Sequence, residues 1–486
     1  MWLFVDQDFF ALGTFAKEET KRLRERSSMS SLALDYTYRY PFASTLTATR
    51  EQPRLRLATC GGAADHPYFF KGRLTQPRRT ADLLRGLVRI VQSRFHMPPA
   101  LLQRILLAAD PVVTAGEDIL RLEVFSACCS TYARVDLLPP AMDGENFSRG
   151  TTNVDFNAPM RAALAKIRDA DQVVLSVGAD ALTLEKAADQ VVERKVSLPL
   201  RWLKGFVEVQ AYQARMSRCL EVAGPEAQRF FRSLPRRNLR QACWVVPAGR
   251  GLRLSQCSAN DGVCVGGIQR LSALENLARE ARRLRIYAEP VTQTSAWELV
   301  FPEARFFLVL SPEVWRGFSG EGQVLTALAQ KKWERTLPHV RAALKWEATI
   351  DPVVLSKRCC APIDAITAAL ATLGSRGLVG YDLAEGAYFQ RELPFDLSRI
   401  EALQPRLRDA RKLIAGGGIV VMRRAPDYLE ALVPGSGVEH RVRLTTAGSR
   451  CTCPWFAKHQ GMRGPCKHVL ALEILEDDKA ETTPCP

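Results

Sequence analysis

Residues 451–468 read CTCPWFAKHQGMRGPCKH, and they gather three of the thirteen cysteines and two of the six histidines of the chain. Cys451 and Cys453 form one closely spaced pair, and Cys466 and His468 form a second pair after a twelve-residue loop. Thiolate sulfur and imidazole nitrogen are the ligands that zinc prefers, and four of them around one ion are typical of structural sites. The spacing therefore predicts one zinc ion bound by these four residues.

The predicted ligand set leaves the metal no free coordination position. Three thiolates and one neutral imidazole complete a tetrahedral shell, whereas a catalytic zinc keeps one position for water. We therefore expect a structural metal, and binding energies of roughly 10–16 kcal/mol for such sites are enough to fold a small module. Pro454 and Pro465 lie next to the two pairs and suit the sharp bends that bring close ligands to one point.

The residues on either side of this stretch predict the local fold. The segment YLEALVPGSGVEHRVRL (428–444) contains two alternating apolar stretches joined by PGSG, which indicates a β-hairpin. The segment KHVLALEIL (467–475) begins a helix directly at the second ligand pair. We expect a ββ–zinc–α module over residues 416–476.

This module resembles the SWIM zinc finger, whose pattern is Cys-x-Cys, a variable loop and Cys-x-His. The resemblance covers the hairpin near 428–446, the ligands Cys451, Cys453, Cys466 and His468, and the helix after them. His459 matches no ligand position, and we expect it to be a surface histidine. The resemblance implies a module that interacts with DNA or with other proteins.

The whole chain also resembles bacterial SWIM-domain proteins of similar length, often encoded beside MoxR-type AAA+ ATPases and von Willebrand factor A proteins. This wider resemblance rests on short signals such as SRF (93–95) and RWLKGFVEVQ (201–210). It implies an adaptor role in such an ATPase and von Willebrand factor A system.

The charge of the chain is strongly basic, with a formal net charge of +15 and a pI near 9.4. Such a balance favours anionic partners, nucleic acid first and acidic proteins or anionic lipid next, although an arginine-rich composition also arises in a GC-rich genome. Residues 420–470 contain eight basic and three acidic side chains. The candidate partner-binding residues of the module are Arg441, Arg443, Lys458, Arg463 and Lys467.

Residues 337–395 predict a winged-helix-like module. Three helical segments, 337–348, 352–361 and 363–377, are followed by a strand–turn–strand pattern with a turn at Glu385–Gly386. The third helix of a winged helix commonly enters the major groove of DNA. Its expected outward positions, Asp364, Thr367, Ser375 and Arg376, include a single basic residue, and many winged helices instead mediate protein contacts.

The rest of the chain predicts an α+β multidomain protein with mixed α/β N-terminal and middle regions. We expect a non-native or flexible start at 1–28, domains at 29–150 and 151–330, and a disordered tail at 477–486. A helix near 200–216 interleaves basic and aromatic side chains. These aromatics either stack on a nucleic-acid strand or pack inward, with Arg201 and Lys204 extending to the surface.

Signals for an enzyme or a membrane protein are poor. The chain has no P-loop motif and no H-E-x-x-H, and GFSGEG (317–322) does not fit the nucleophile elbow. No apolar run approaches the length of a membrane span, and the cysteines do not form a disulfide-like pattern. We expect a cytoplasmic protein with no catalytic residues and no membrane partner.

Two hypotheses follow from these observations. The first is a non-catalytic adaptor whose zinc module docks protein partners, with a MoxR-type ATPase and a von Willebrand factor A protein as the candidates. The second is a nucleic-acid-binding protein in which the winged helix and the zinc module form one basic footprint.

Overall fold

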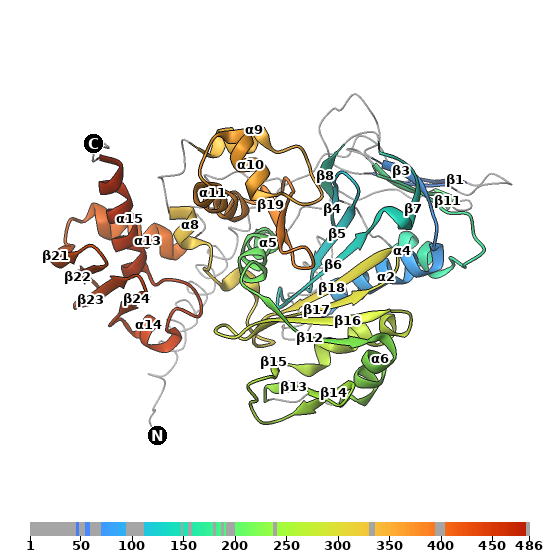
Figure 1. Cartoon of the computed structure of the whole chain (residues 1–486), viewed down its shortest axis with the longest axis horizontal. Helices are drawn as coiled ribbons and strands as arrows, with labels where there is room; N and C mark the ends of the chain where they lie inside the picture. The colour runs from blue at the N-terminus through green and yellow to red at the C-terminus, as the bar shows by residue number, and fades with distance from the viewer. Residues whose placement is uncertain are drawn as a thin grey trace, which may run out of the picture.

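The computed structural model describes residues 45–47, 54–58, 70–93, 111–146, 149–153, 158–177, 181–185, 189–190, 200–236, 241–329, 336–393 and 404–482. Over these residues the chain forms five antiparallel sheets and twelve α-helices, which confirms the predicted α+β class. The C-terminal sheet and its helices, orange to red in Figure 1, lie at one end of the molecule, far from strands β1 (Thr45–Thr47) and β3 (Phe70–Leu74).

The largest of these sheets has eight strands. In spatial order they are β12 (Ser217–Ala223), β16 (Arg283–Glu289), β17 (Thr294–Val300), β18 (Ala304–Leu310), β6 (Thr131–Leu137), β5 (Leu120–Phe125), β4 (Val112–Ala115) and β8 (Gly150–Asn153). Strands β5, β6 and β18 are buried along their whole length. Both faces of the sheet are therefore covered at its centre.

The two faces differ in chemistry because successive side chains of a strand point to opposite sides. Leu122, Val135 and Phe306 are neighbours on one face. Helix α2 (Pro77–Gln92) packs on this apolar face, and its Gly86 lies against the ring of Phe306. A larger residue than glycine would push the helix away from the sheet.

The opposite face carries charged side chains that are almost fully buried, and the hairpin of β19 (Val379–Asp382) and β20 (Ala387–Gln390) covers them. Asp382 accepts hydrogen bonds from Arg121 at 2.9 Å, Arg134 at 3.0 Å and Arg305 at 3.1 Å. Burial alone would oppose ionisation, but the three guanidinium groups hold the pKa of Asp382 well below its usual range. This network fixes where the hairpin lies on the sheet.

The predicted division at residue 150 runs through the eight-stranded sheet, since β6, which precedes residue 150, pairs with β18, which follows it.

A second sheet has seven strands, and a third has three. The seven strands are β11 (Asp189–Gln190), β1, β2 (Arg54–Ala58), β10 (Ala181–Glu185), β9 (Val174–Val177), β3 and β7 (Met142–Asn146). The three strands are β14 (Gly251–Ser255), β13 (Cys243–Ala248) and β15 (Val263–Val265).

Short helices connect these sheets. They are α4 (Ala158–Ala165), α6 (Gly224–Ser233), α7 (Ser272–Glu275), α8 (Leu325–Ala329), and the 3-10 helices η1 (Pro139–Ala141), η2 (Ile268–Leu271), η3 (Leu277–Arg279) and η4 (Phe318–Gly320). The predicted start at 1–28 lies outside the described residues. No helix in the described part of the chain combines the length and the apolar character that a membrane span requires.

Helix α5 (Leu200–Gln213) decides between the two readings of its aromatic side chains. Trp202 and Phe206 are fully buried, and their rings lie 6.0 and 5.0 Å from that of Phe125. Arg201 donates to the carbonyl of Cys128 at 3.0 Å. The aromatics therefore pack inward on the sheet and do not form a stacking platform.

Residues 337–393 have the predicted order of elements, with α9 (Leu337–Ala343), α10 (Pro352–Cys359) and α11 (Ile363–Ser375) before the β19–β20 hairpin. The winged-helix fold itself is not confirmed. Of the expected outward positions of α11, Asp364 and Thr367 are exposed, whereas Ser375 is fully buried and bonds to Thr372. The hairpin is buried on the large sheet and does not project as a wing.

The C-terminal unit contains a sheet of four strands, two more than predicted. They are β21 (Val420–Ala425), β22 (Tyr428–Pro434), β23 (Glu439–Thr445) and β24 (Gly448–Cys451). Helices α13 (Pro405–Ala415) and α15 (Lys467–Thr482) pack together, and α15 lies against the sheet. Helix α15 continues to Thr482, into the segment 477–486 for which we predict a disordered tail.

Candidate metal centre

Three turns of the backbone bring the predicted ligands together. Cys451 ends β24, and Cys453 caps helix α14 (Pro454–His459) with its sulfur, which accepts a bond from the amide of Phe456 at 3.3 Å. Cys466 directly precedes α15, and His468 lies in the first turn of that helix. The amides of Cys453 and Val469 point at the sulfurs of Cys451 and Cys466, each at 3.4 Å.

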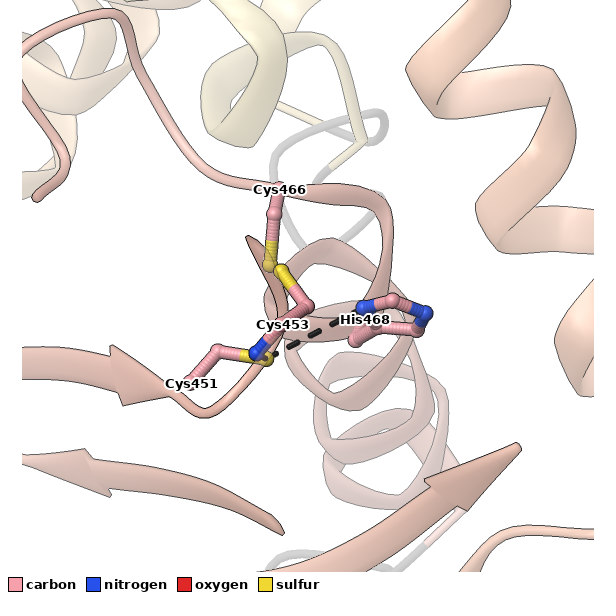
Figure 2. A group of neighbouring side chains, drawn as sticks. All are labelled: Cys451, Cys453, Cys466 and His468. Carbon is pink, nitrogen blue, oxygen red and sulfur yellow. Dashed lines mark hydrogen bonds between the residues drawn. The ribbon is translucent and has the colours of Figure 1, made fainter. Parts of the chain in front are cut away.

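The four side chains converge on one point (Figure 2). One ligand atom from each residue lies within 4.8 Å of all the others, and all four residues are buried. Nδ1 of His468 is 3.9 Å from Sγ of Cys451, so this nitrogen faces the sulfurs. The spacing suits a single ion with bonds of about 2.0–2.3 Å.

The protonation of the sulfurs shows why a cation fits this cluster. Hydrogen bonds from the neighbouring thiols, that of Cys451 first, lower the pKa of Cys466 to about 4. The same bond to Cys466, together with burial, raises the pKa of Cys451, and burial raises that of Cys453. One thiolate is favoured and a second or third is not, because like charges repel in a buried site. A dication removes that repulsion, and a zinc ion would hold all three as thiolates.

Comparison with known families agrees with this geometry. Residues 440–476 match the SWIM zinc finger family. The match spans all four ligands, and the buried cluster fits one structural zinc ion.

Other comparisons add little to the SWIM match. No curated protein matches the chain. The crystal structure of Proliferating Cellular Nuclear Antigen from Entamoeba histolytica is similar over 50% of this chain and 99% of that chain, with 8% sequence identity and a TM-score of 0.32. A TM-score this low does not establish a shared fold.

Two other histidines of the C-terminal unit are not part of the ligand set. The ring of His440 is 4.5 Å from that of His468, and burial lowers the pKa of His440. The prediction overlooked His440, although the alternation of β23 places it on the same inner face as Val442. His459, expected at the surface, is half-buried and lies 4.8 Å from the ring of Trp455.

The five predicted partner-binding residues of the SWIM finger fall into different environments. Arg441 and Arg443 are exposed on β23 and pair with Glu430 at 3.4 and 3.0 Å. Lys458 is exposed, and Lys467 is half-buried. These four remain on or near the surface.

Arg463 differs from that expectation, because its side chain turns toward the rest of the protein. It donates to the carbonyl of Gly320 at 3.0 Å and lies 3.3 Å from the carboxylate of Glu321. Only 23% of its side chain is exposed. Because its guanidinium pairs with a nearly buried carboxylate, Arg463 serves an internal contact.

A groove of about 900 Å³ lies on the outer side of the four-stranded sheet β21–β24, and we call it the arginine groove. Its lining residues are Tyr428, Arg441, Arg443, Thr445, Ala447, Gly448, Ser449, Arg450, Cys451, Thr452, Phe456, Ala457 and Gln460. Arg450 was not among the predicted binding residues. It lies directly opposite Arg443 on the neighbouring strand, and the β23–β24 pairing reveals this only in the structure.

Proposed function

We propose that this chain is a non-catalytic, zinc-stabilised interaction protein that binds the acidic surface of a partner protein in the arginine groove. The observation that carries this proposal is the lining of the groove. Arg441, Arg443 and Arg450 lie in it together, and its lining includes no carboxylate. Guanidinium groups bind carboxylates with two parallel hydrogen bonds, which gives both charge and direction.

Two of the three arginines of the groove are already held in place before a partner binds. Glu430 lies beside the groove and pairs with Arg441 and Arg443, which restricts the freedom of their long side chains. Arg450 is exposed and has no ion-pair partner in the part of the chain that the structure describes. It is the guanidinium that a partner carboxylate can bind without displacing an existing pair.

An acidic protein suits this surface better than a phosphate backbone. Glu430 would repel phosphates that approach two of the three arginines, whereas a protein can place its carboxylates selectively. Tyr428 and Phe456 add apolar surface to the groove. The wider resemblance suggests a MoxR-type ATPase or a von Willebrand factor A protein as the partner, and we propose an adaptor role with such a protein.

Nucleic acid is the second candidate partner. The net charge of +15 favours it, since phosphate contacts gain affinity by releasing counterions. Of the outward positions of α11, Asp364 and Thr367 are exposed without positive charge and Ser375 is buried, which argues against the predicted footprint that combines this helix with the zinc module. The arginine groove alone would then have to supply the phosphate contacts.

The test compares two ligands on two matched variants of the full chain. One variant carries Arg441→Ala, Arg443→Ala and Arg450→Ala, and its control carries Arg250→Ala, Arg253→Ala and Arg408→Ala. The control residues are exposed arginines outside the groove, so both variants lose the same charge. Fluorescence anisotropy with labelled poly-glutamate and with a random 20-base-pair duplex is measured at several salt concentrations.

We expect poly-glutamate affinity to fall at least tenfold in the groove variant and to change little in the control. The groove variant could instead lose mainly its affinity for the duplex, with a salt dependence of duplex binding that indicates the release of several counterions. That result would support nucleic acid as the partner. Equal binding of both ligands by the groove variant and the control would refute the groove as the interaction site. A pull-down of the tagged protein with nuclease treatment then separates protein partners from nucleic-acid bridging.

A further inference from the structure

Arg406 joins the zinc finger to the rest of the chain from outside the segment that matches SWIM. Its Nη1 donates to the carbonyls of Arg463 at 2.8 Å and Pro465 at 3.0 Å, and its Nη2 donates to the carbonyl of Glu321 at 2.8 Å. Its guanidinium also lies 4.8 Å from the centre of the Trp455 ring. One side chain on α13 thus contacts two segments that are far apart in the sequence.

The residues that Arg406 contacts are close to the zinc ligands. Pro465 directly precedes Cys466, and Trp455 is two residues after Cys453. The loop 454–465 is therefore held at both ends by ligands and at its second half by Arg406. A change in the position of this loop moves Cys466.

Further bonds dock the same loop on residues 316–323. Arg316 and Gln323 both donate to the carbonyl of Met462, each at 3.0 Å. The bond from Arg463 to Gly320 runs in the opposite direction. Arg316 is itself fixed by Glu321, whose carboxylate accepts from its Nε and Nη2, each at 2.8 Å.

We propose that Arg406 is a positioning residue of the zinc site, and that zinc binding and the docking of loop 454–465 on residues 316–323 are thermodynamically coupled. Zinc fixes Cys453 and Cys466 and so presents the carbonyls of the loop to Arg406, Arg316 and Gln323. Coupling of this kind is reciprocal, so the docked loop must raise zinc affinity by the factor by which zinc favours docking.

The test measures zinc affinity in the full chain by competition with a chromophoric chelator. Arg406→Ala is compared with Arg408→Ala, which removes the same charge from an exposed position on the same helix. Groups that orient metal ligands from outside the coordination shell typically change affinity by about 10–100-fold. We expect a loss in that range for Arg406→Ala and less than a twofold change for Arg408→Ala.

Limited trypsin digestion supplies a readout that general destabilisation would not reproduce. With saturating zinc, Arg406→Ala should be cut after Arg463 at least tenfold faster than the wild type. Cleavage after Arg134, which is buried in the large sheet, should stay as slow as in the wild type. Treating the wild type with a chelator should expose the same bond at Arg463.

Zinc affinity of Arg406→Ala within twofold of the wild type would overturn the proposal, and so would unchanged cleavage at Arg463. If Arg406→Ala does not fold, Gln323→Ala decides, because it removes a single bond to the same loop. A measurable loss of zinc affinity in Gln323→Ala supports the coupling, and an unchanged affinity refutes it.

Discussion

Gly464 lies so close to Gly322 that a Cβ atom on Gly464 would overlap the carbonyl oxygen of Gly322. Gly464 also has a φ of +77°, in the region that favours glycine. The zinc-finger loop and the segment before α8 therefore touch backbone to backbone. No side chain fits between them.

Gly464→Ala should loosen the docked loop, and Gly461→Ala is its matched control. Gly461 has a φ of +80° in the same loop but open space around its Cβ position. Positive φ costs an alanine about 1–2 kcal/mol at either site, and only Gly464→Ala adds the backbone overlap. Hydrogen exchange should show faster exchange of the Met462 and Arg463 amides in Gly464→Ala than in Gly461→Ala, and equal exchange would contradict the close contact.

Loss of a zinc ligand should remove the metal. Cys453→Ser and His468→Ala each delete one of four ligands from a buried site, so we expect purified protein to contain far less than one zinc per chain. His459→Ala is the control, because this histidine lies outside the cluster and should leave one zinc per chain. Elemental analysis checks all three, and zinc retained in both ligand variants would refute the assignment.

Asp382→Asn should destabilise the protein strongly. The carboxylate accepts bonds from three buried arginines, and removing one partner of such a network leaves unpaired charge in the interior. The expected cost is about 3–5 kcal/mol. Glu385→Gln in the same hairpin removes a half-exposed carboxylate and should cost less than about 1 kcal/mol. Thermal unfolding temperatures of the two variants should therefore differ clearly, and similar values would show that the network contributes little.

Glu208 should make stability fall as the pH rises. Burial, with a further contribution from the nearby carboxylate of Glu321, raises the pKa of Glu208 to about 8. The folded chain then holds a proton that the unfolded chain releases above its ordinary pKa of about 4.3. The free energy of unfolding therefore decreases between about pH 4.5 and 8, by at most about 1.4 kcal/mol per pH unit.

Glu208→Gln tests this dependence because its side chain stays neutral at every pH. Relative to the wild type, the variant should gain in unfolding temperature as the pH is raised from 5.5 to 8.5. Glu439→Gln, which changes an exposed carboxylate on β23, should follow the wild type across the same range. A constant difference between Glu208→Gln and the wild type would contradict the raised pKa.

The zinc site was predictable because the residues that define it lie close together in the sequence. Metal ligation depends on residue type and close spacing, and both are visible in residues 451–468. The hairpin of β22 and β23 and helices α2, α5 and α11 were predictable for the same reason, since alternation and helical periodicity act over a few residues.

The docking of the loop was not predictable from local patterns. Arg406 is one of 67 basic residues, and its partners lie 57, 59 and 85 positions away in the chain. Arg463 looked like a surface residue because nothing near it in the sequence shows the buried Glu321 that attracts it.

The buried charges of the large sheet were hidden for a related reason. Arg121, Arg134 and Asp136 alternate with apolar residues, which ordinarily indicates a face in contact with water. The distant hairpin that contains Asp382 covers this face, together with helix α5. The residue pattern of a strand does not show that a segment far away in the sequence covers it.

The pairing of β6 with β18 has a consequence for folding during synthesis on the ribosome. Leu137 pairs with Ala304, so about 170 residues must be made after one strand before its neighbour exists. At about 5–20 residues per second, this strand waits for roughly ten to thirty seconds with an open edge. An unpaired strand edge promotes aggregation, so we expect the nascent chain to be most prone to aggregate during that interval.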